Sequence, residues 1–365
     1  MAFFDEVFKD VTKLGRKLPT TAYEDQGTYP IVDQSQKEIA GYTEETEGLY
    51  ADVPAIVFGD HTRVIKYIDR PCFLGADGVK LLKAKDPNAN HRYLYYVLQN
   101  ARIPNTGYNR HFKWLKEVDI PLPEAKRQDE IVSILDSLTT LLVLRKQQLT
   151  KLDELVKSRF IELFGMPGTD AFGWGLVPLG SICNINPKKS LDSRLVSGAV
   201  VSFVPMPAVT EHGEIDATAI KEYDEVKTGF TYFAENDVLF AKITPCMENG
   251  KGAVAKGLHN GIGFGSTEFH VLRPISGKSD PYWIYTLTAF SQFRMDAASN
   301  MTGSAGQRRV PASFLENYRV SLPPIALQEQ FAAFVEQTDK SKLAVRQSLE
   351  KLETLKKSLM QQYFG

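Results

Sequence analysis

Residues 118–165 read VDIPLPEAKRQDEIVSILDSLTTLLVLRKQQLTKLDELVKSRFIELFG, and residues 318–365 read YRVSLPPIALQEQFAAFVEQTDKSKLAVRQSLEKLETLKKSLMQQYFG. The two stretches share one pattern at a constant offset of 200, without insertion or deletion, and both end in Phe-Gly. Internal repeats decide architecture, and a period of this length indicates duplicated domains and not a solenoid. We therefore interpret the chain as two similar halves, each a globular domain followed by one copy of this stretch.

Each copy carries the signals for one long helix. Proline stands near both starts, at Pro123 and Pro323, where a first helical turn tolerates it, and glycine ends both copies, at Gly165 and Gly365. Apolar residues recur alternately three and four apart, which is a heptad seam, and a helix of about 40 residues would be about 60 Å long. The seam positions are Ile131, Leu135, Leu138, Leu142, Arg145, Leu149, Leu152, Val156, Arg159 and Leu163 in the first copy, and Phe331, Val335, Thr338, Lys342, Val345, Leu349, Leu352, Lys356, Leu359 and Tyr363 in the second.

The seams predict that the two helices pair with each other. A lone helix could not bury its apolar stripe, so we expect an antiparallel, coiled-coil-like pair with approximate two-fold symmetry between the halves. The polar seam residues Arg145 and Lys342 are expected to fix this pairing or the docking of a partner. The apolar residues expected to form the pairing or partner surface are Leu135, Leu138, Leu142, Leu149, Leu152, Val335, Val345, Leu349, Leu352 and Leu359. The alternative is two separate amphipathic helices, each lying on its own domain.

Composition is that of an ordinary globular protein. The chain has 365 residues, 43% of them hydrophobic and 24% charged, which leaves room for two domains beyond the helices. Its three cysteines, Cys72, Cys183 and Cys246, are too scattered for a disulfide framework or a zinc site and favour a reducing compartment. The first 15 residues do not resemble a signal peptide, and no run of 18 apolar residues occurs, so we expect a cytoplasmic protein.

Outside the repeat, the two halves show the same features in the same order. These are strand-like runs at 52–58 and 237–241, polar turns opening into strands at 75–82 and 265–272, short aromatic helices at 93–98 and 282–287, and Thr-Gly-led loops at 106–111 and 302–309. We therefore expect an α+β fold with two mixed α/β domains. The expected boundaries are 1–121 for the first domain, 122–165 for the first helix, 166–321 for the second domain and 322–365 for the second helix.

Polar loops in both halves carry side chains suited to nucleic acid. The densest polar loop lies at 241–252, where lysine and threonine suit phosphate contacts and Glu248 and Asn249 suit base edges. The candidate DNA-binding residues are Arg63, Lys80, Asn109, Arg110, His111, Lys242, Thr244, Glu248, Asn249, Lys251, Ser266, Thr267, Gln307, Arg308 and Arg309. Solvated surface loops are the alternative interpretation. The net charge of −1 weighs mildly against an autonomous nucleic-acid binder, although a local basic patch can suffice.

Signals for catalysis are weak. The stretch 280–283, Asp-Pro-Tyr-Trp, is similar to the Asp-Pro-Pro-Tyr loop of amino-methyltransferases but lacks the second proline, and the glycines at 261–265 have the wrong spacing for a dinucleotide loop. No serine or cysteine nucleophile context accompanies His61. Asp216 with Glu225-Val226-Lys227 could be fitted to a metal-nuclease pattern, but charged residues at this spacing are common by chance, and solvated surface is the favoured interpretation. We therefore expect no catalytic residues, no metal and no cofactor in this chain.

Two divergent globular domains, each followed by a similar helix, resemble the DNA-specificity subunit of type I restriction-modification systems. The residues that carry the resemblance are the Leu-Pro-x₄-Gln openings at 122–128 and 322–328, the stretch from Trp174 to Pro178-Leu179-Gly180, and Thr-Pro-Cys-Met-Glu-Asn-Gly-Lys at 244–251. The resemblance spans the whole chain. The first domain departs from it, because no tryptophan precedes Lys13-Leu14-Gly15.

The resemblance implies a function and a set of partners. It implies two target-recognition domains, each reading one half of a split, asymmetric site in double-stranded DNA, with the helices as a spacer. It also implies two methyltransferase (modification) subunits and restriction/translocase subunits, which would hold S-adenosylmethionine, ATP and magnesium and would supply part of the positive field around the duplex. The competing class is a coiled-coil adaptor between proteins without direct DNA contact.

Overall fold

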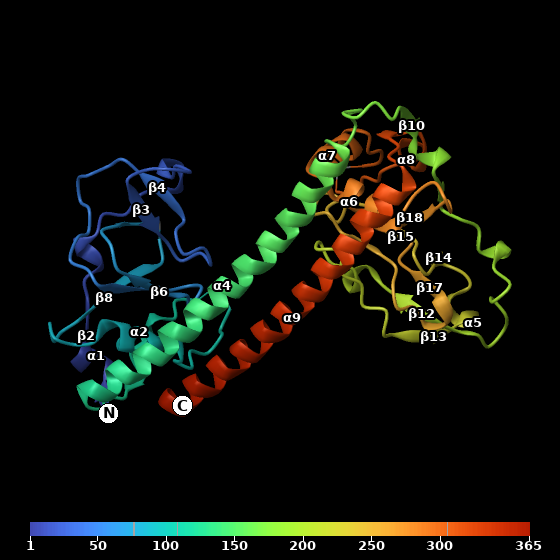
Figure 1. Cartoon of the computed structure of the whole chain (residues 1–365). Coiled ribbons are helices and arrows are strands. Elements are labelled where there is room, and N and C mark those ends of the chain that lie inside the picture. The colour runs from blue at the N-terminus through green and yellow to red at the C-terminus, as the bar shows by residue number, and fades with distance from the viewer. Residues whose placement is uncertain (76, 108, 305) are drawn as a thin grey trace. The chain divides into compact units, whose positions relative to one another are not determined.

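The computed structural model describes residues 1–75, 77–107, 109–304 and 306–365. These residues form two compact units, drawn in Figure 1: Met1–Arg145 with Ser348–Gly365, and Lys146–Gln347. The long helices α4 (Ala125–Phe164) and α9 (Ile325–Phe364) each contribute one segment to each unit. Each unit therefore combines one globular domain with two helical segments.

The first domain is built on two main β-sheets, of four and three strands, with a further two-stranded sheet. Its strands are β1 (Ala2–Phe3), β2 (Phe8–Asp10), β3 (Tyr29–Val32), β4 (Gly41–Thr43), β5 (Ala55–Gly59), β6 (Ile65–Ile68), β7 (Phe73–Leu74), β8 (Val79–Ala84) and β9 (Asp119–Ile120). Its helices are α1 (Phe4–Val7), α2 (His91–Gln99) and α3 (Phe112–Leu115), with 3₁₀ turns at Thr12–Leu14 and Thr20–Ala22. The four-stranded sheet has the order β2-β8-β5-β6 and is antiparallel, whereas the three-stranded sheet β4-β3-β7 contains one parallel pair, β3 and β7.

The second domain repeats this plan. Its strands are β10 (Leu176–Pro178), β11 (Cys183–Ile185), β12 (Val200–Val204), β13 (Ile220–Glu222), β14 (Thr231–Ala234), β15 (Val238–Ala241), β16 (Gly252–Val254), β17 (Ile262–Gly265), β18 (Phe269–Pro274) and β19 (Arg319–Ser321). Its helices are α5 (Tyr223–Val226), α6 (Pro281–Ala289), α7 (Ser291–Ser299) and α8 (Ala312–Asn317), with 3₁₀ turns at Leu179–Ser181, Lys189–Leu191, Met206–Ala208 and His259–Gly261. The sheet β11-β18-β15-β16 matches β2-β8-β5-β6 of the first domain. In the other sheet, β13-β12-β17-β14, the first three strands match β4-β3-β7, with β12 parallel to β17, and β14 is an additional edge strand. The mixed α+β class expected from the sequence is confirmed.

The central strand of each domain is buried on both faces. In β5, Ile56 and Phe58 join one apolar cluster with α2, while Val57 joins a second cluster that lies between the two sheets. In β15, Phe240 and Leu239 divide in the same way between two clusters. Successive side chains of a strand point to opposite faces, so these short apolar runs bind a helix on one side and the second sheet on the other.

The repeated stretch supplies the same four core positions to both units. The cluster of the first unit contains Ile131 and Leu135 of α4 with Met360 of α9, and the partly buried Phe364 of α9 packs against it. The cluster of the second unit contains Phe331 and Val335 of α9, with Phe160 and Phe164 of α4. Each residue of one set lies 200 positions from its counterpart in the other. Each domain is therefore held by the beginning of one helix and the end of the other.

The terminal Phe-Gly of each copy has a defined task. The ring of Phe364 lies 5.6 Å from that of Tyr93 on α2, and the ring of Phe164 lies 6.4 Å from that of Trp283 on α6. Gly165 adopts a φ of +78°, the left-handed conformation that ends helices and favours glycine. The duplicated ending thus docks each helix on the aromatic helix of a domain.

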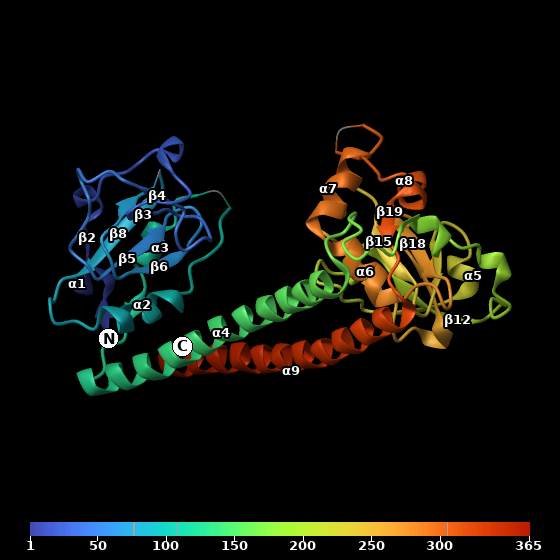
Figure 2. The ribbon, with the colours of Figure 1, turned by 45° about the horizontal axis from the view of Figure 1, so that its top comes forward.

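Within each unit the two helical segments run antiparallel, as Figure 2 shows. In the first unit, Lys356 Nζ donates to Thr139 Oγ1 at 3.0 Å. In the second, Lys342 Nζ lies 2.7 Å from Asp153 Oδ1. Residue numbers in both pairs add to the same total, so one antiparallel register serves both units. This confirms the antiparallel pairing predicted from the seams, and the alternative of two separate helices is wrong.

The Leu-Pro-x₄-Gln openings are explained by a side-chain clamp. Helices α4 and α9 begin two residues after Pro123 and Pro323, so these prolines precede the first turn and do not lie within it as we expected. Gln128 Nε2 donates to the carbonyl of Pro123 at 2.8 Å, and Gln328 Nε2 donates to that of Pro323 at 2.9 Å. Each glutamine therefore fastens the entering chain to the first turn of its helix.

Candidate nucleic-acid interface

Three polar segments of the second domain meet at one end of β15. The first segment is residues 242–251, which we call the polar loop, and the second is residues 302–309, which we call the Thr-Gly loop. The third is the turn at 266–268, before β18. The amide of Lys242 donates to the carbonyl of Glu268 at 2.9 Å, and the amide of Val310 donates to the carbonyl of Lys242 at 2.9 Å. The amide of Thr244 donates to the carbonyl of Arg308 at 3.0 Å. The structure thus brings together candidates that lie about 60 residues apart in the sequence. Ala305 of the Thr-Gly loop lies outside the described residues.

Arg309 fastens the Thr-Gly loop to the turn before β18. Its Nη2 lies 2.7 Å and its Nε 2.9 Å from the carboxylate of Glu268, and its Nη1 donates to the carbonyl of Gln307 at 3.0 Å. These bonds from Arg309 hold the pKa of the Glu268 carboxyl below its usual range. Because the guanidinium is engaged on both edges, its first task is to hold the loop, and not to read bases.

Arg308 and Glu248 lie face to face. Arg308 Nη2 is 4.0 Å from Glu248 Oε1 and 3.3 Å from the carbonyl of Ala298. Both side chains keep about two fifths of their surface exposed, 43% and 39%. An exposed pair of this length is weak, so either partner can exchange the other for a base edge or a phosphate.

The remaining candidates of the second domain differ in accessibility. Glu248, Asn249, Thr267 and Gln307 are exposed, whereas Lys242, Thr244, Lys251 and Ser266 are partly buried. Ser266 Oγ accepts from the amide of Glu268 at 3.2 Å, and Thr244 Oγ1 lies 3.5 Å from the Met301 sulfur. The exposed side chains are therefore those best placed for a ligand, while Ser266 and Thr244 stabilise the loops.

The first domain has the same hydrogen-bonded framework. The amide of Asp60 donates to the carbonyl of Gly78 at 2.6 Å, and the amide of His111 donates to the carbonyl of Asp60 at 2.8 Å. Strand β5 ends at Gly59 opposite Val79, as β15 ends at Ala241 opposite Phe269. Asp60 and His111 hence occupy the places of Lys242 and Val310, and by the same count Arg110 occupies that of Arg309. The two domains hold different side chains on one framework.

His111 has to be removed from the candidates. Its ring is fully buried, with Nδ1 3.0 Å from the carbonyl oxygen of Asp60. A buried ring held in this way cannot contact a nucleic acid. It was selected because it ends a polar loop, and the sequence did not reveal that the chain turns inward at that residue.

The other candidates of the first domain divide between held and exposed side chains. Lys80 pairs with Asp10 at 3.0 Å and lies 4.9 Å above the ring centre of Phe112. Arg63 Nη1 donates to the carbonyl of Ile103 at 3.2 Å. Asn109 and Arg110 are exposed. Tyr108, which belongs to the same loop in the sequence, lies outside the described residues.

Two framework residues were missed by the sequence-based interpretation. Asp60 Oδ1 accepts from the amide of Phe112 at 2.7 Å, and His270 on β18 donates from Nε2 to the carbonyl of Val310 at 2.8 Å. Both are polar but almost fully buried, at 4% and 5% exposed. Asp60 ties the end of β5 to the start of α3, and His270 ties β18 to the residue that follows the Thr-Gly loop. The only sequence signal was a polar residue in or beside a strongly apolar strand.

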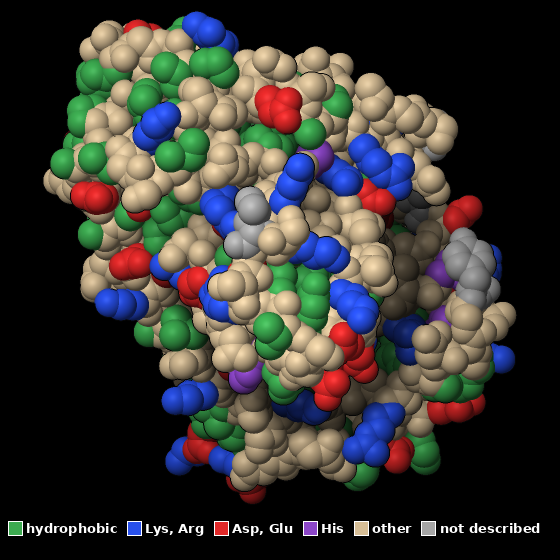
Figure 3. Space-filling view, turned by 90° about the vertical axis from the view of Figure 1, so that its right-hand side faces the viewer, with side chains coloured by type: hydrophobic (Ala, Val, Ile, Leu, Met, Phe, Trp, Pro, Cys, Tyr) green, Lys and Arg blue, Asp and Glu red, His purple; other side chains and the backbone are tan. Residues whose placement is uncertain are grey.

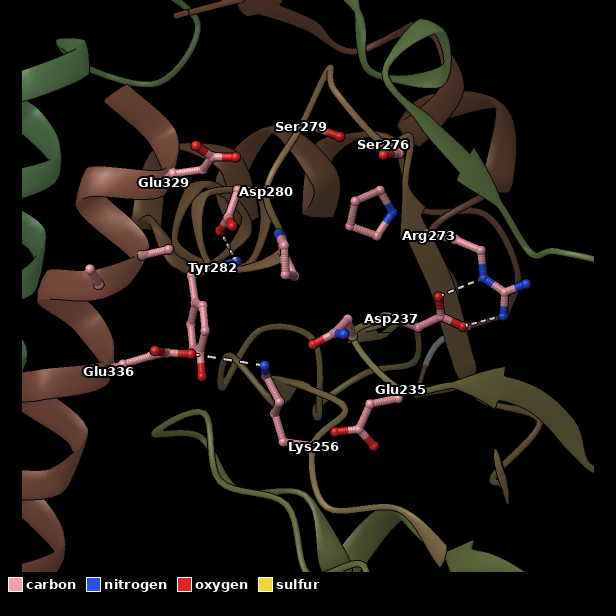
Figure 4. Close-up of a pocket in the computed structure, with 15 residues that line it drawn as sticks. Glu235, Asp237, Lys256, Arg273, Ser276, Ser279, Asp280, Tyr282, Glu329 and Glu336 are labelled. Atoms are coloured by element: carbon pink, nitrogen blue, oxygen red, sulfur yellow. Dashed lines mark hydrogen bonds and ion pairs between the residues drawn. The ribbon is translucent and has the colours of Figure 1, made fainter. Parts of the chain in front are cut away.

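A cavity of about 550 Å³ lies between the second domain and α9 (Figure 4). Asp237 is 1% exposed and takes two hydrogen bonds from Arg273, at 2.6 and 2.7 Å. Burial raises the pKa of Asp237, and Arg273 opposes that rise. Lys256 reaches Glu336 of α9 at 3.9 Å, and Asp280 caps α6 through the amide of Tyr282 at 2.8 Å. Of these contacts, that of Lys256 with Glu336 joins the domain to α9, whereas the pair of Asp237 with Arg273 and the Asp280 cap stabilise the domain itself.

The predicted pairing residues lie along the contact between the helical segments. Leu135, Leu138, Val335 and Val345 are buried. Those that are partly buried are Leu142, Leu149, Leu152, Leu349, Leu352 and Leu359. Of the polar seam residues, Lys342 is buried between Asp153 and Asp339, and Arg145 is partly buried. The seam is thus turned inward along its length in both units.

The surface carries both signs of charge. On the face that Figure 3 shows, Lys and Arg side chains are spread among Asp and Glu side chains.

Across the described ranges, no group of three or more His, Cys, Asp or Glu side chains is arranged to hold a metal ion. In the same ranges, none of the helices has the length and apolar character needed to cross a membrane.

Comparison with known proteins decides the family. The model of the type I restriction modification DNA specificity domain matches residues 5–154 and again residues 172–354. The chain belongs to this family. The two matches each take in one globular domain with most of the helix that follows it. The resemblance noted in the sequence is thereby confirmed.

Relatives of this DNA specificity family include two proteins of Escherichia coli. The specificity subunit of type I restriction enzyme EcoEI is 44% identical over 153 residues, which is 42% of this chain and 25% of the relative. That of EcoAI is 42% identical over 159 residues, 43% of this chain and 26% of the relative. The matches span about a quarter of the length of these relatives. Both are specificity subunits, in agreement with the expectation of a non-catalytic chain.

A solved structure shows the same fold. The crystal structure of the type I restriction-modification system S subunit from M. genitalium aligns with 100% of this chain and 95% of its own, at a TM-score of 0.58 and 16% identity. At this identity the similarity concerns the fold alone. It extends over both globular domains and both long helices.

Proposed function

We propose that this specificity-family chain recognises a bipartite, asymmetric target in double-stranded DNA, with one half-site for each globular domain. The observation that carries the proposal is the common framework of the two domains, which presents different residues at equivalent places. A symmetric target would need two equal surfaces, whereas here, by the same register, the exposed Asn109 stands where Arg308 stands. Asn109 and Arg110 in one domain, and Glu248, Asn249, Gln307 and Arg308 in the other, are the proposed base and phosphate contacts.

The long helices are the proposed spacer and partner-docking frame. Their single antiparallel register in both units supports this role. The proposed partners are two methyltransferase subunits and restriction/translocase subunits. Those subunits would hold S-adenosylmethionine, ATP and magnesium, and this chain would direct their chemistry without taking part in it.

The decisive experiment is to sequence the methylated bases of the host genome with and without this chain. We expect one split, asymmetric motif to lose its methylation when the chain is deleted and to regain it on complementation. Persistence of every methylated motif would contradict the proposal.

The adaptor alternative is tested by DNA retention. The assembled complex should retain duplex DNA with an affinity that falls steeply as salt rises, because phosphate contacts release counterions. If the partner subunits assemble with this chain but retain DNA equally well in its absence, the adaptor is favoured.

A further inference from the structure

A hairpin of the second domain contacts both long helices. It comprises residues 209–216, between β12 and β13. His212 Nδ1 lies 3.5 Å from Asp153 Oδ2 on α4, and the Glu214 carboxylate forms an ion pair with Arg346 on α9. All of these residues belong to the second unit. One short hairpin therefore connects the domain to each helical segment of its unit.

The hairpin is internally braced. Val209 pairs with Ile215, and the amide of Thr210 donates to the carbonyl of Glu214 at 3.0 Å. Gly213 at the tip has a φ of +86°, and a Cβ added there would lie 2.5 Å from the hydroxyl of Tyr285 on α6. The tip thus packs closely against Tyr285 of α6, with a backbone conformation that favours glycine, so the hairpin contacts α6 as well as the long helices.

The same hairpin reaches the polar loop. The amide of Gly252, which directly follows that loop, donates to the carbonyl of Thr210 at 3.4 Å. A cavity of about 380 Å³ is lined by His212 together with Asp153 and Lys342 of the helices and Asn249 of the polar loop. The hairpin therefore stands between the helical segments and the base of the loop.

Among the residues that the structure describes, the hydrogen bonds of the corresponding connection in the first domain stay within that domain. This connection runs through residues 33–40, between β3 and β4, and is shorter than residues 205–219 between β12 and β13. Gln34 Nε2 donates to the carbonyl of Asp77 at 3.0 Å, and Gln34 Oε1 accepts from the amide of His61 at 3.2 Å. Both connections contact turns at the end of the central strand of their domain. The connection of the second domain also forms ion pairs with the long helices.

We propose that the 209–216 hairpin is a positioning element, which couples the spacer helices to the polar loop and so sets recognition of the second half-site only. This inference rests on the proposed function. Glu214 and Arg346 act through the loop and do not contact DNA. Movement of the helices, for example when a partner docks on them, would reach one half-site and leave the other unchanged.

The experiment uses the full chain in its complex with the methyltransferase partners. The variants are Glu214→Gln, the charge swap Glu214→Arg with Arg346→Glu, and Glu211→Gln as a matched control in the same hairpin. The first measurement is hydrogen exchange at the amides of 242–251 without DNA. The second is the methylation rate on duplexes carrying one changed base in either half-site.

The expected results separate coupling from simple damage. Glu214→Gln should speed exchange in the polar loop about twofold to fivefold, the range that the loss of a partly exposed ion pair allows. It should lower discrimination at the second half-site alone, the charge swap should restore both properties, and Glu211→Gln should leave both near wild type.

Three outcomes would overturn the proposal: unchanged exchange in Glu214→Gln, faster exchange that the charge swap fails to restore, or equal loss of discrimination at both half-sites. If the wild-type complex shows no discrimination at either half-site, the proposed function itself fails. The exchange measurement still decides whether the hairpin is tied to the helices.

Discussion

The ammonium of Lys342 lies 2.7 Å from the carboxylate of Asp153 across the two long helices, with only 7% of the lysine exposed. It also lies 3.3 Å from Asp339 on its own helix. In the first copy of the repeat the equivalent position is Leu142. The two helix pairs therefore have one register but different chemistry at this layer.

This relationship predicts different costs for two substitutions. Lys342→Glu would place a third carboxylate beside Asp153 and Asp339, and should lower the free energy of unfolding of the second unit by about 3 kcal/mol, the lower part of the range for a broken buried pair. Lys342→Leu, which copies position 142, should cost less, about 1 kcal/mol, because both aspartates keep some contact with water. Urea unfolding followed by circular dichroism measures both. Equal costs would show that the charge at this layer is unimportant.

The buried side-chain amide of Gln328 predicts a large loss of stability when it is removed. It is fully buried, donates to the carbonyls of Pro323 at 2.9 Å and Lys278 at 3.1 Å, and accepts from the amide of Asp280 at 3.0 Å. Gln328→Ala leaves these groups without their partner and should lower the free energy of unfolding by about 2–3 kcal/mol. The exposed neighbour Gln330→Ala is the control and should stay within about 0.5 kcal/mol of wild type. The same urea titration compares the two, and a similar loss in both variants would contradict the clamp.

The pair of Arg309 with Glu268 predicts a dependence on pH. The pKa of Glu268 is lowered in the folded chain, so its contribution is present above the unfolded value of 4.5 and is lost as pH falls through the folded value. Glu268→Gln removes the contribution at neutral pH, at a cost below about 1 kcal/mol because both partners are partly exposed. The stability difference between wild type and variant should therefore shrink as the pH is lowered below about 4.5. A difference that stays constant from pH 7 to 3 would exclude this role.

The exposed residues of the two domains predict separable effects on recognition. Arg308→Ala and Asn249→Ala should weaken methylation only of sites that depend on the second half-site, by about 1–3 kcal/mol if each makes a bidentate base contact. Arg110→Ala should act on the first half-site alone. Methylation rates on duplexes with altered half-sites give the measurement. If all three variants keep both half-sites, these loops do not read DNA.

The common register predicts how to lengthen the spacer. Seven residues inserted after Arg145 and seven after Gln347 keep the pairing of the helices in both units, because the units meet at these points in the sequence. The added length is about 10 Å, or about three base pairs at 3.4 Å each. Mapping of the methylated sequence should show the same half-sites with a longer gap. An unchanged gap would contradict the role of the helices as a spacer, and insertion in one helix alone should instead impair folding.

Much of the frame could be predicted from the sequence, because repeats and heptads are local patterns. The offset of 200 predicted both helices, their glycine ends and their antiparallel pairing. It did not predict that Phe364 docks on the first domain and Phe164 on the second, since that choice depends on which end of each helix meets which domain.

The candidate site was harder to predict, because its framework is made by backbone bonds between distant segments. The bonds from Lys242 to Glu268 and from Val310 to Lys242 leave no trace in composition. In the sequence, Arg309 and His111 looked like free polar residues. In the structure, Arg309 binds Glu268 and His111 is buried. The hairpin at 209–216 carries no motif, and only its contacts with α4 and α9 distinguish it from an ordinary turn.

The division of the chain into units also bears on the order of folding during synthesis. The second unit is one continuous stretch, Lys146–Gln347, whereas the first unit needs both the N-terminal residues and Ser348–Gly365. The core of the first unit contains Met360, so the first domain, which is made before the second, can complete its core only after residue 360 has been made. Until then its apolar surface around Ile131 and Leu135 is incomplete. Of the two domains, the first is therefore expected to be the more exposed to aggregation and proteolysis while translation continues.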